Sequence, residues 1–154
     1  MTYNVDDVPM PPGPSNDRLR GMLLGVAIGD ALGNTAESLN PPQREEEHGV
    51  IRDYLPNSRA SGKAIGLPSD ETQLSFWALE SLLEKGHIDP EHLLELYTER
   101  DIIRPGHAVE RAIEAYQYGA EWREAGEPSA GNGALTREPV AVLPHIPNPA
   151  RTLW

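Results

Sequence analysis

Four adjacent residues place two carboxylates and two hydroxyls side by side, in the order Ser-Asp-Glu-Thr, immediately before a mostly apolar segment. Hard cations such as Mg²⁺ prefer oxygen ligands, and Ser69, Asp70, Glu71 and Thr72 offer several of them from one turn. The same residues are also typical of a helix start, because Ser69 or Asp70 can accept a hydrogen bond from a free backbone N–H group. A Gln three residues after Asp70 fits a loose capping box. These residues alone leave a metal site and a helix cap both open.

Two further polar segments interrupt apolar or glycine-rich sequence. Residues 29–38 read GDALGNTAES, and residues 129–140 read SAGNGALTREPV. In the second segment, Gly131, Asn132 and Gly133 allow the backbone to approach a ligand closely, and exposed N–H groups in such a turn suit phosphate oxygens. In the first segment, Asp30 is a carboxylate among apolar residues and needs polar partners. The amino terminus of the next helix or the surroundings of a metal could supply these partners.

Composition narrows the classes of function. The chain of 154 residues carries a formal net charge of −11, which argues against a general nucleic-acid or anionic-membrane surface. The longest apolar run, residues 19–32, contains two charged residues and is shorter than the roughly 20 residues that a membrane helix needs. There is no cysteine, which excludes disulfides and thiolate metal ligands, and the amino terminus lacks a signal-peptide pattern. We therefore expect a cytoplasmic protein with no membrane or nucleic-acid partner.

The apolar periodicity predicts an all-α fold, a compact orthogonal multi-helix bundle without strands. Residues 1–16 are rich in proline and are expected to form a flexible tail, and residues 17–154 the helical domain. The first helix, over residues 17–33, has apolar residues on most sides, which predicts burial nearly all round. Its glycines recur every fourth residue, and each costs about 1 kcal/mol relative to alanine. Close packing of a helix or binding of a ligand would explain them: Gly21, Gly25, Gly29 and Gly33.

Further helices are expected at three places. Prolines and glycines predict a long loop over residues 40–68, with a solvated acidic run at residues 45–47. The next helix starts at the Ser-Asp-Glu-Thr segment, is central in the bundle and ends before Gly86. Asp89 followed by proline predicts the start of another helix, and a fourth is expected over residues 107–122. The chain ends on an apolar Leu-Trp pair, which suggests a connection into a further helix.

In their order and spacing, the three polar segments resemble the ADP-ribosylglycohydrolase family, the group that includes the dinitrogenase reductase-activating glycohydrolase. The resemblance runs from about residue 18 to residue 154. It implies an all-α hydrolase that uses two Mg²⁺ or Mn²⁺ ions to remove ADP-ribose from modified side chains or from related ADP-ribosyl compounds. An ADP-ribosylated protein or a small ADP-ribosyl compound is then the expected partner.

The resemblance also implies roles for particular residues. Ser69, Asp70 and Glu71 match the metal-binding positions of the family, and Asp70 is thereby a catalytic residue. Glu37, just after the Gly-Asp-Ala-Leu-Gly segment, matches an acidic residue near the substrate and is a candidate proton-handling or gating acid. The family's glycine-rich turn, which lines the ADP-ribose site, matches Gly131, Asn132, Gly133 and Ala134.

Two departures from the family pattern affect these expectations. Glu71 stands where the family usually has Asp, and its extra methylene moves the carboxylate outward. Members of the family are also much longer, and no Asp-x-Asp motif, their second acidic metal motif, occurs in this sequence. The expected fold is therefore truncated and the metal cage incomplete. The alternative is a catalytically inactive fragment or a subunit that binds an ADP-ribosyl ligand, with a second chain supplying the missing half.

Overall fold

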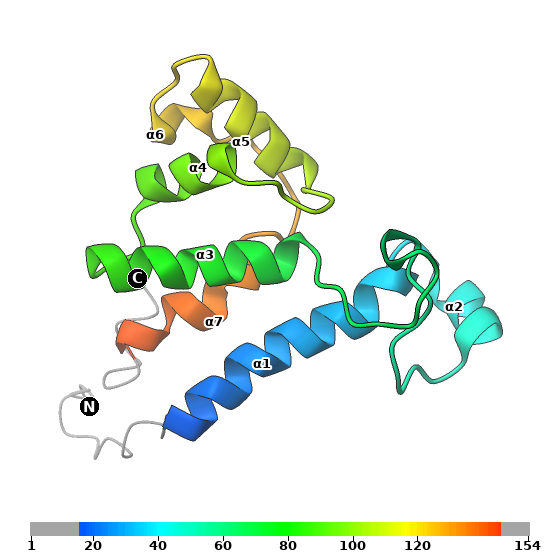
Figure 1. Ribbon diagram of the computed structural model, residues 1–154. Coiled ribbons are helices and arrows are strands. Elements are labelled where there is room, and N and C mark those ends of the chain that lie inside the picture. The colour runs from blue at the N-terminus through cyan, green and yellow to red at the C-terminus, as the bar shows by residue number, and fades with distance from the viewer. Residues whose placement is uncertain (1–15, 146–154) are drawn as a thin grey trace, which may run out of the picture.

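The computed structural model describes residues 16–145, and its helices confirm the all-α prediction (Figure 1). Within that range the backbone forms no strand, only an isolated bridge between Asn57 and Lys63. The proline-rich residues 1–15 and the final residues 146–154 lie outside the described part. The elements are α1 (Asn16–Gly33), η2 (Asn34–Ala36), α2 (Pro41–His48), η3 (Ser58–Ala60), α3 (Asp70–Lys85), α4 (Pro90–Glu99), α5 (His107–Gln117), α6 (Trp122–Ala125), η4 (Leu135–Arg137), α7 (Glu138–Ala141) and η5 (Leu143–His145).

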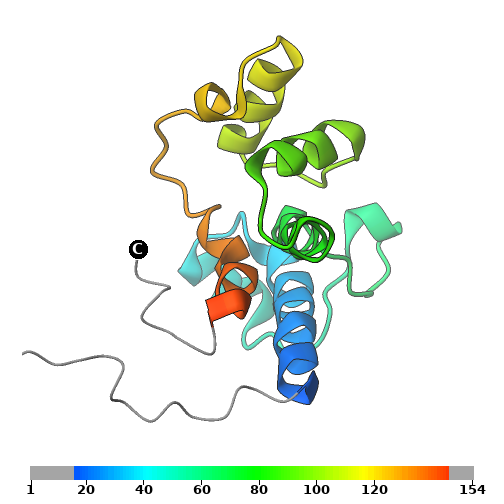
Figure 2. The same ribbon diagram turned by 90° about the vertical axis from the view of Figure 1, so that its left-hand side faces the viewer.

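Helix α3 is central, as predicted. It packs against α1, α4, α7 and η4, and Figures 1 and 2 show α4 on one side of it and α7 on the other. It ends at Gly86, whose φ of 78° provides the left-handed conformation that closes a helix. The buried core lies between α3, α4 and α6, and partly buried residues of α5 pack against it. Its buried members are Leu74, Leu94, Leu96, Tyr97 and Ala125.

Local signals explain where α4 begins and where α5 ends. The Asp89 side chain accepts hydrogen bonds from the N–H groups of Glu91 and His92, and proline follows at the first helical position, which confirms the predicted start of α4. The predicted helix over residues 107–122 extends too far, because α5 ends at Gln117. Gly119 has a φ of +93°, so the chain turns there and starts the separate short helix α6.

The predicted loop over residues 40–68 contains a helix that the prediction missed. The Asn40 side chain accepts from the Gln43 N–H group, and the Gln43 side chain accepts from the Asn40 N–H group, forming a capping box at the start of α2. α2 is polar on every side and contributes no buried residue, so it has no apolar stripe to reveal it. The acidic run at residues 45–47 is exposed, as expected.

Helix α1 is less covered than its composition predicted. Ala31 is its one buried residue, and Leu24 and Ile28 are 60% and 47% exposed. A Cβ atom built on Gly21, Gly25, Gly29 or Gly33 would meet no neighbouring atom within 4 Å. Within residues 16–145, no close helix contact therefore explains the glycine row. Neither α1 nor any other helix of this range combines the length and apolarity that a bilayer span requires.

We predict that replacing Gly25 by Ala stabilises the protein by about 0.5–1 kcal/mol, because the new methyl group has free space and alanine favours a helix. Chemical denaturation followed by circular dichroism measures the change. Gly86→Ala is the matched control and should destabilise, because its φ of +78° disfavours a side chain. A loss of stability in Gly25→Ala would show that the glycine face is packed in solution.

Candidate active site

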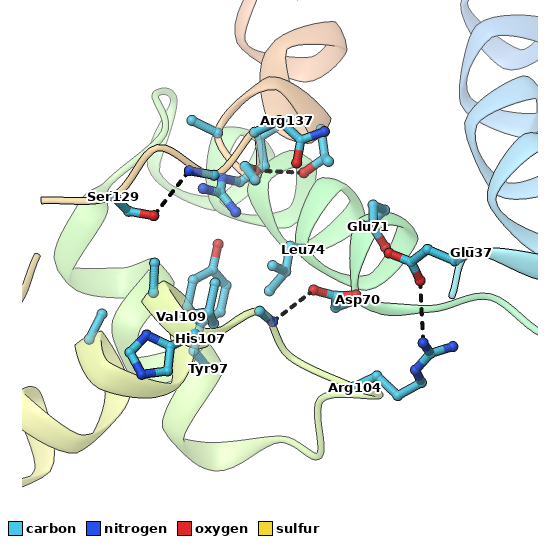
Figure 3. A pocket seen from close by; sticks show the side chains of 18 residues that line it. Glu37, Asp70, Glu71, Leu74, Tyr97, Arg104, His107, Val109, Ser129 and Arg137 are labelled. Atoms are coloured by element: carbon cyan, nitrogen blue, oxygen red, sulfur yellow. Dashed lines mark hydrogen bonds and ion pairs between the residues drawn. The ribbon is translucent and has the colours of Figure 1, made fainter. Parts of the chain in front are cut away.

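A cavity of about 550 Å³ lies beside the amino-terminal end of α3 (Figure 3). Its walls come from five parts of the chain. Glu37 follows η2, and Asp70, Glu71 and Leu74 lie in the first turns of α3. Tyr97 belongs to α4, and the loop before α5 contributes with the start of that helix. The fifth part is the glycine-rich segment of residues 129–137. The three polar segments that stand out in the sequence therefore meet at one cavity.

Asp70 and Glu71 form an acidic wall of this cavity. The backbone N–H of Gly106 donates to Oδ2 of Asp70 at 3.3 Å. Burial first, and then the hydrogen bond and negative charge of neighbouring Glu71, together raise the pKa of Asp70 to about 6. The Glu71 carboxylate also contacts the Ser69 hydroxyl. Two carboxylates in these positions repel one another when both are ionised, and a proton or a cation relieves that repulsion.

Asp30 of α1 holds the segment that carries this acidic pair. Its carboxylate accepts hydrogen bonds from the Ser69 N–H at 2.7 Å and hydroxyl at 2.7 Å, and from the Thr72 hydroxyl at 2.6 Å and N–H at 3.3 Å. The Asn34 amide donates to it as well, at 3.0 Å. Burial opposes ionisation of Asp30, but these hydrogen bonds outweigh it and lower its pKa. Of the two alternatives left open by the sequence, the amino terminus of the next helix supplies the partners.

The helix-cap prediction for Ser69 and Asp70 is wrong in its details. Ser69 occupies the N-cap position of α3, but its side chain makes no capping hydrogen bond. The Gln73 side chain, expected in a capping box with Asp70, instead donates to the carbonyl of Asp101 and accepts from the N–H of Ile103. The capping role belongs to Asp30, which reaches α3 from a different helix. Local spacing cannot reveal a cap of this kind.

The three predicted metal ligands differ in their access to the cavity. Asp70 and Glu71 line it, whereas Ser69 is only 2% exposed and does not. Carboxylate oxygens suit Mg²⁺ or Mn²⁺, but such ions need about six ligands and these two side chains supply only part of them. Across residues 16–145, no group of three or more His, Asp or Glu side chains is placed to hold a metal ion. The metal-binding role of Ser69, Asp70 and Glu71 therefore stays a prediction.

Glu37 lies at the exposed edge of the cavity. Its side chain is 57% exposed, and its carboxylate pairs with Arg104 at 3.4 Å. Figure 3 shows this ion pair. Arg104 also donates to the backbone carbonyl of Asn34 at 3.2 Å, so it connects the start of η2 to the loop before α5. The sequence offered no motif that would single out Arg104. This placement leaves the predicted proton-handling or gating role of Glu37 open to experiment.

The predicted substrate-binding turn lines the cavity with all four of its residues, Gly131, Asn132, Gly133 and Ala134. The turn is exposed but internally connected, because the Thr136 hydroxyl donates to the carbonyl of Gly133 at 2.8 Å. The Ser75 hydroxyl of α3 donates to the carbonyl of Thr136 at 2.5 Å and ties the turn to the central helix. Besides Arg104, three further lining residues with ionisable side chains had no role predicted from the sequence: Tyr97, His107 and Arg137.

Comparisons with known proteins agree on one family. The family model described as ADP-ribosylglycohydrolase matches residues 11–153. The chain is 32% identical over 143 residues to the ADP-ribosyl-[dinitrogen reductase] glycohydrolase of Rhodospirillum rubrum, covering 90% of this chain and 48% of that relative. It is 30% identical over 151 residues to the ADP-ribosylarginine hydrolase Tri1 of Serratia proteamaculans, covering 87% and 38%. An uncharacterized protein of Archaeoglobus fulgidus is 32% identical over 135 residues, covering 84% and 44%. The chain spans less than half the length of these relatives.

We predict that Asp30→Ala lowers the free energy of unfolding by about 2–4 kcal/mol at pH 7, because several buried donors lose a charged acceptor. The pKa of Asp30 is lowered by folding, so its stabilisation is present above the unfolded value near 3.8 and is lost as the pH falls through the lower folded value. The difference between variant and parent should therefore shrink in acid. Urea titrations at several pH values measure it.

The control for this prediction is Asp101→Ala, which removes an exposed carboxylate and should change stability by less than about 0.5 kcal/mol. Equal effects of the two substitutions at pH 7 would contradict the role given to Asp30.

Proposed function

Because this chain belongs to the ADP-ribosylglycohydrolase family, we propose that it forms part of the active site of a hydrolase that removes ADP-ribose from modified side chains or from related ADP-ribosyl compounds. One observation carries the proposal. The three segments on which the family resemblance depends surround a single cavity, although they are far apart in the sequence. That cavity has an acidic wall at Asp70 and Glu71 and a glycine-rich wall at residues 131–134.

The names of two relatives suggest the substrate class. One acts on ADP-ribosyl-[dinitrogen reductase] and the other on ADP-ribosylarginine. We therefore propose a protein side chain carrying ADP-ribose as the substrate, with ADP-ribosylarginine as the linkage to test first. The glycine-rich turn would bind the phosphates through its backbone, and the reacting ribose would lie toward Asp70 and Glu71.

The chemistry is hydrolysis of a glycosidic bond. The bond between the ribose anomeric carbon and the side-chain nitrogen breaks, the oxygen of water bonds to that carbon, and a proton passes to the departing nitrogen. A carboxylate can take the proton from water or deliver it to the leaving group. Asp70, whose raised pKa lies near 6, and Glu37 at the cavity edge are the candidates for this role.

Asp70 and Glu71 are also the residues that would hold a divalent cation, and their oxygen donors fit Mg²⁺ or Mn²⁺. When bound, such ions supply charge that positions ribose hydroxyls and water. The two side chains provide fewer ligands than the ion needs, and the sequence contains no Asp-x-Asp motif. We propose that the other ligands come from protein outside these 154 residues, such as a second chain.

The alternative function is binding without catalysis. It is favoured by the incomplete set of cation ligands among the described residues. In that case the chain is an inactive fragment or a subunit that binds an ADP-ribosyl ligand or a partner. Binding and catalysis are separated by measuring both on the same protein.

We predict that the 154-residue chain alone releases ADP-ribose from ADP-ribosylarginine very slowly or not at all, with or without Mn²⁺, because the cation site is incomplete. Adding the carboxyl-terminal half of a relative as a separate polypeptide should raise the rate. Asp70→Asn should then reduce that rate by about 100-fold or more, because it removes a carboxylate from the reacting end of the cavity. Chromatography of released ADP-ribose follows the reaction.

The control is Glu45→Gln on the exposed face of α2, which should leave the rate unchanged. Fast turnover by the chain alone would contradict the incomplete site. Binding of ADP-ribose without turnover in any combination would favour the binding subunit. A chain that neither binds nor cleaves ADP-ribosyl compounds would overturn the proposed function.

A further inference from the structure

Two unpaired polar atoms lie at the wall of the cavity. Within residues 16–145, the Tyr97 hydroxyl and Nη1 of Arg137 are buried and form no hydrogen bond of regular geometry, although the two side chains lie close to each other, and both residues line the cavity. Folded proteins leave few buried polar groups unpaired, and each such group requires an explanation such as a water, an ion or a ligand. The third unpaired atom in this range, Nδ1 of His92, belongs to a residue that does not line the cavity.

Arg137 also differs from the other basic residues around the cavity. The Arg104 guanidinium pairs with Glu37 at 3.4 Å, and the His107 ring lies 3.1 Å from the Glu127 carboxylate. In the described part of the chain, no carboxylate forms an ion pair with Arg137. Its positive charge is therefore the one at the cavity that no described acidic side chain neutralises.

The two unpaired residues lie together. Figure 3 shows the Tyr97 ring below the Arg137 side chain, with its hydroxyl pointing toward it. Tyr97 is only 8% exposed, and burial raises the pKa of its hydroxyl even though the charge of nearby Arg137 and hydrogen bonding to it act in the opposite direction. The hydroxyl therefore keeps its proton at neutral pH and remains a donor. A guanidinium and a phenol at one wall provide charge and hydrogen bonds that suit an anion.

An anion that binds in this cavity needs a nearby positive charge. The chain has a formal net charge of −11, and Asp70 and Glu71 line the same cavity. The Arg137 charge is partly removed from water, which strengthens its attraction for an anion nearby. Arg137 follows shortly after the glycine-rich turn, so an anion beside that turn would lie within its field.

We propose that Arg137, together with the Tyr97 hydroxyl, determines the specificity of this cavity for ligands that carry a diphosphate. The inference rests on the proposed function and extends it, because an ADP-ribosyl group contains a diphosphate between its two riboses. Arg137 draws the diphosphate to the wall formed by residues 129–137. The ribose that carries the scissile bond is then free to extend toward Asp70 and Glu71.

Isothermal titration calorimetry of the full chain tests this assignment with inorganic pyrophosphate, ADP, ADP-ribose and adenosine. Arg137→Met should weaken binding of the three phosphate-bearing probes about tenfold or more, and adenosine should bind weakly and equally to both proteins. Arg137→Lys should retain part of the affinity because it keeps the charge. Tyr97→Phe should lower the affinity for the phosphate-bearing probes several-fold.

The matched control is Arg123→Met, which removes the same charge from a residue stacked on Trp122 outside this cavity. It should change the affinities less than about twofold. Melting curves identify any variant that fails to fold, and the comparison of Arg137→Lys and Tyr97→Phe with the parent then decides the result.

Two results would overturn the inference. One is equal loss of ADP affinity in Arg137→Met and Arg123→Met, and the other is parent protein that binds pyrophosphate and ADP no better than adenosine. If the parent binds ADP-ribose and Arg137→Met binds it equally well, the inference fails and the proposed function stands. If ADP binds in an Arg137-dependent way but no combination of chains binds or cleaves ADP-ribosylarginine, the proposed function fails and the anion site stands.

Discussion

The carboxylate of Asp30 joins α1 to the first turn of α3, and the placement of the acidic wall depends on it. A partly buried charge is tolerated only when hydrogen bonds replace its lost water, and the start of a helix has N–H groups that need acceptors. Ser69 and Thr72 meet both needs at once, because each donates a hydroxyl and an N–H to Asp30. The same contact fixes the backbone between them, which carries Asp70 and Glu71. Asp30 thus positions two charged side chains at the cavity, although it does not line the cavity itself.

The cavity combines opposite electrostatic requirements within a small space. On the acidic wall, burial and the proximity of Glu71 favour a protonated or cation-bound Asp70. On the wall formed by residues 129–137, Arg137 has a positive charge that no described carboxylate neutralises. A ligand with a negative centre and a neutral sugar end satisfies both walls in one orientation. This complementarity explains how a chain of strongly negative net charge can be suited to a phosphate-bearing ligand.

Features set by neighbouring residues were predictable from the sequence. The Asp89 cap, the Gly86 helix end and the apolar stripe of α3 are local signals, and the structure agrees with them. The exposure of α1 was not predictable, because an apolar helix shows only that it can be buried, whereas its neighbours decide whether it is. Helix α2 was missed because its capping box lies in a segment with no apolar face.

The candidate site likewise has residues that the sequence predicted and residues that it did not. Asp70, Glu71 and the turn at residues 131–134 stand out by composition, and the structure brings them to one cavity. Tyr97 belongs to no motif, and Arg137, although it lies in the 129–140 segment, was given no role of its own; only the folded chain brings both to the cavity wall. The role of Asp30 could not be predicted either, because its donors Ser69 and Thr72 lie 39 and 42 residues away in the sequence.

We propose that Asp70 and Glu71 form one wall of a cation-dependent glycohydrolase site. The most direct test is a Mn²⁺ titration of the 154-residue chain followed by electron paramagnetic resonance. We expect weak binding, with a dissociation constant on the order of 1 mM, because the ligand set is incomplete. Binding should disappear in Asp70→Asn, persist in Glu45→Gln, and weaken as the pH falls below about 6, where protons compete for Asp70. Binding that is unaffected by Asp70→Asn, or no detectable binding by the parent, would show that Asp70 and Glu71 form no cation site.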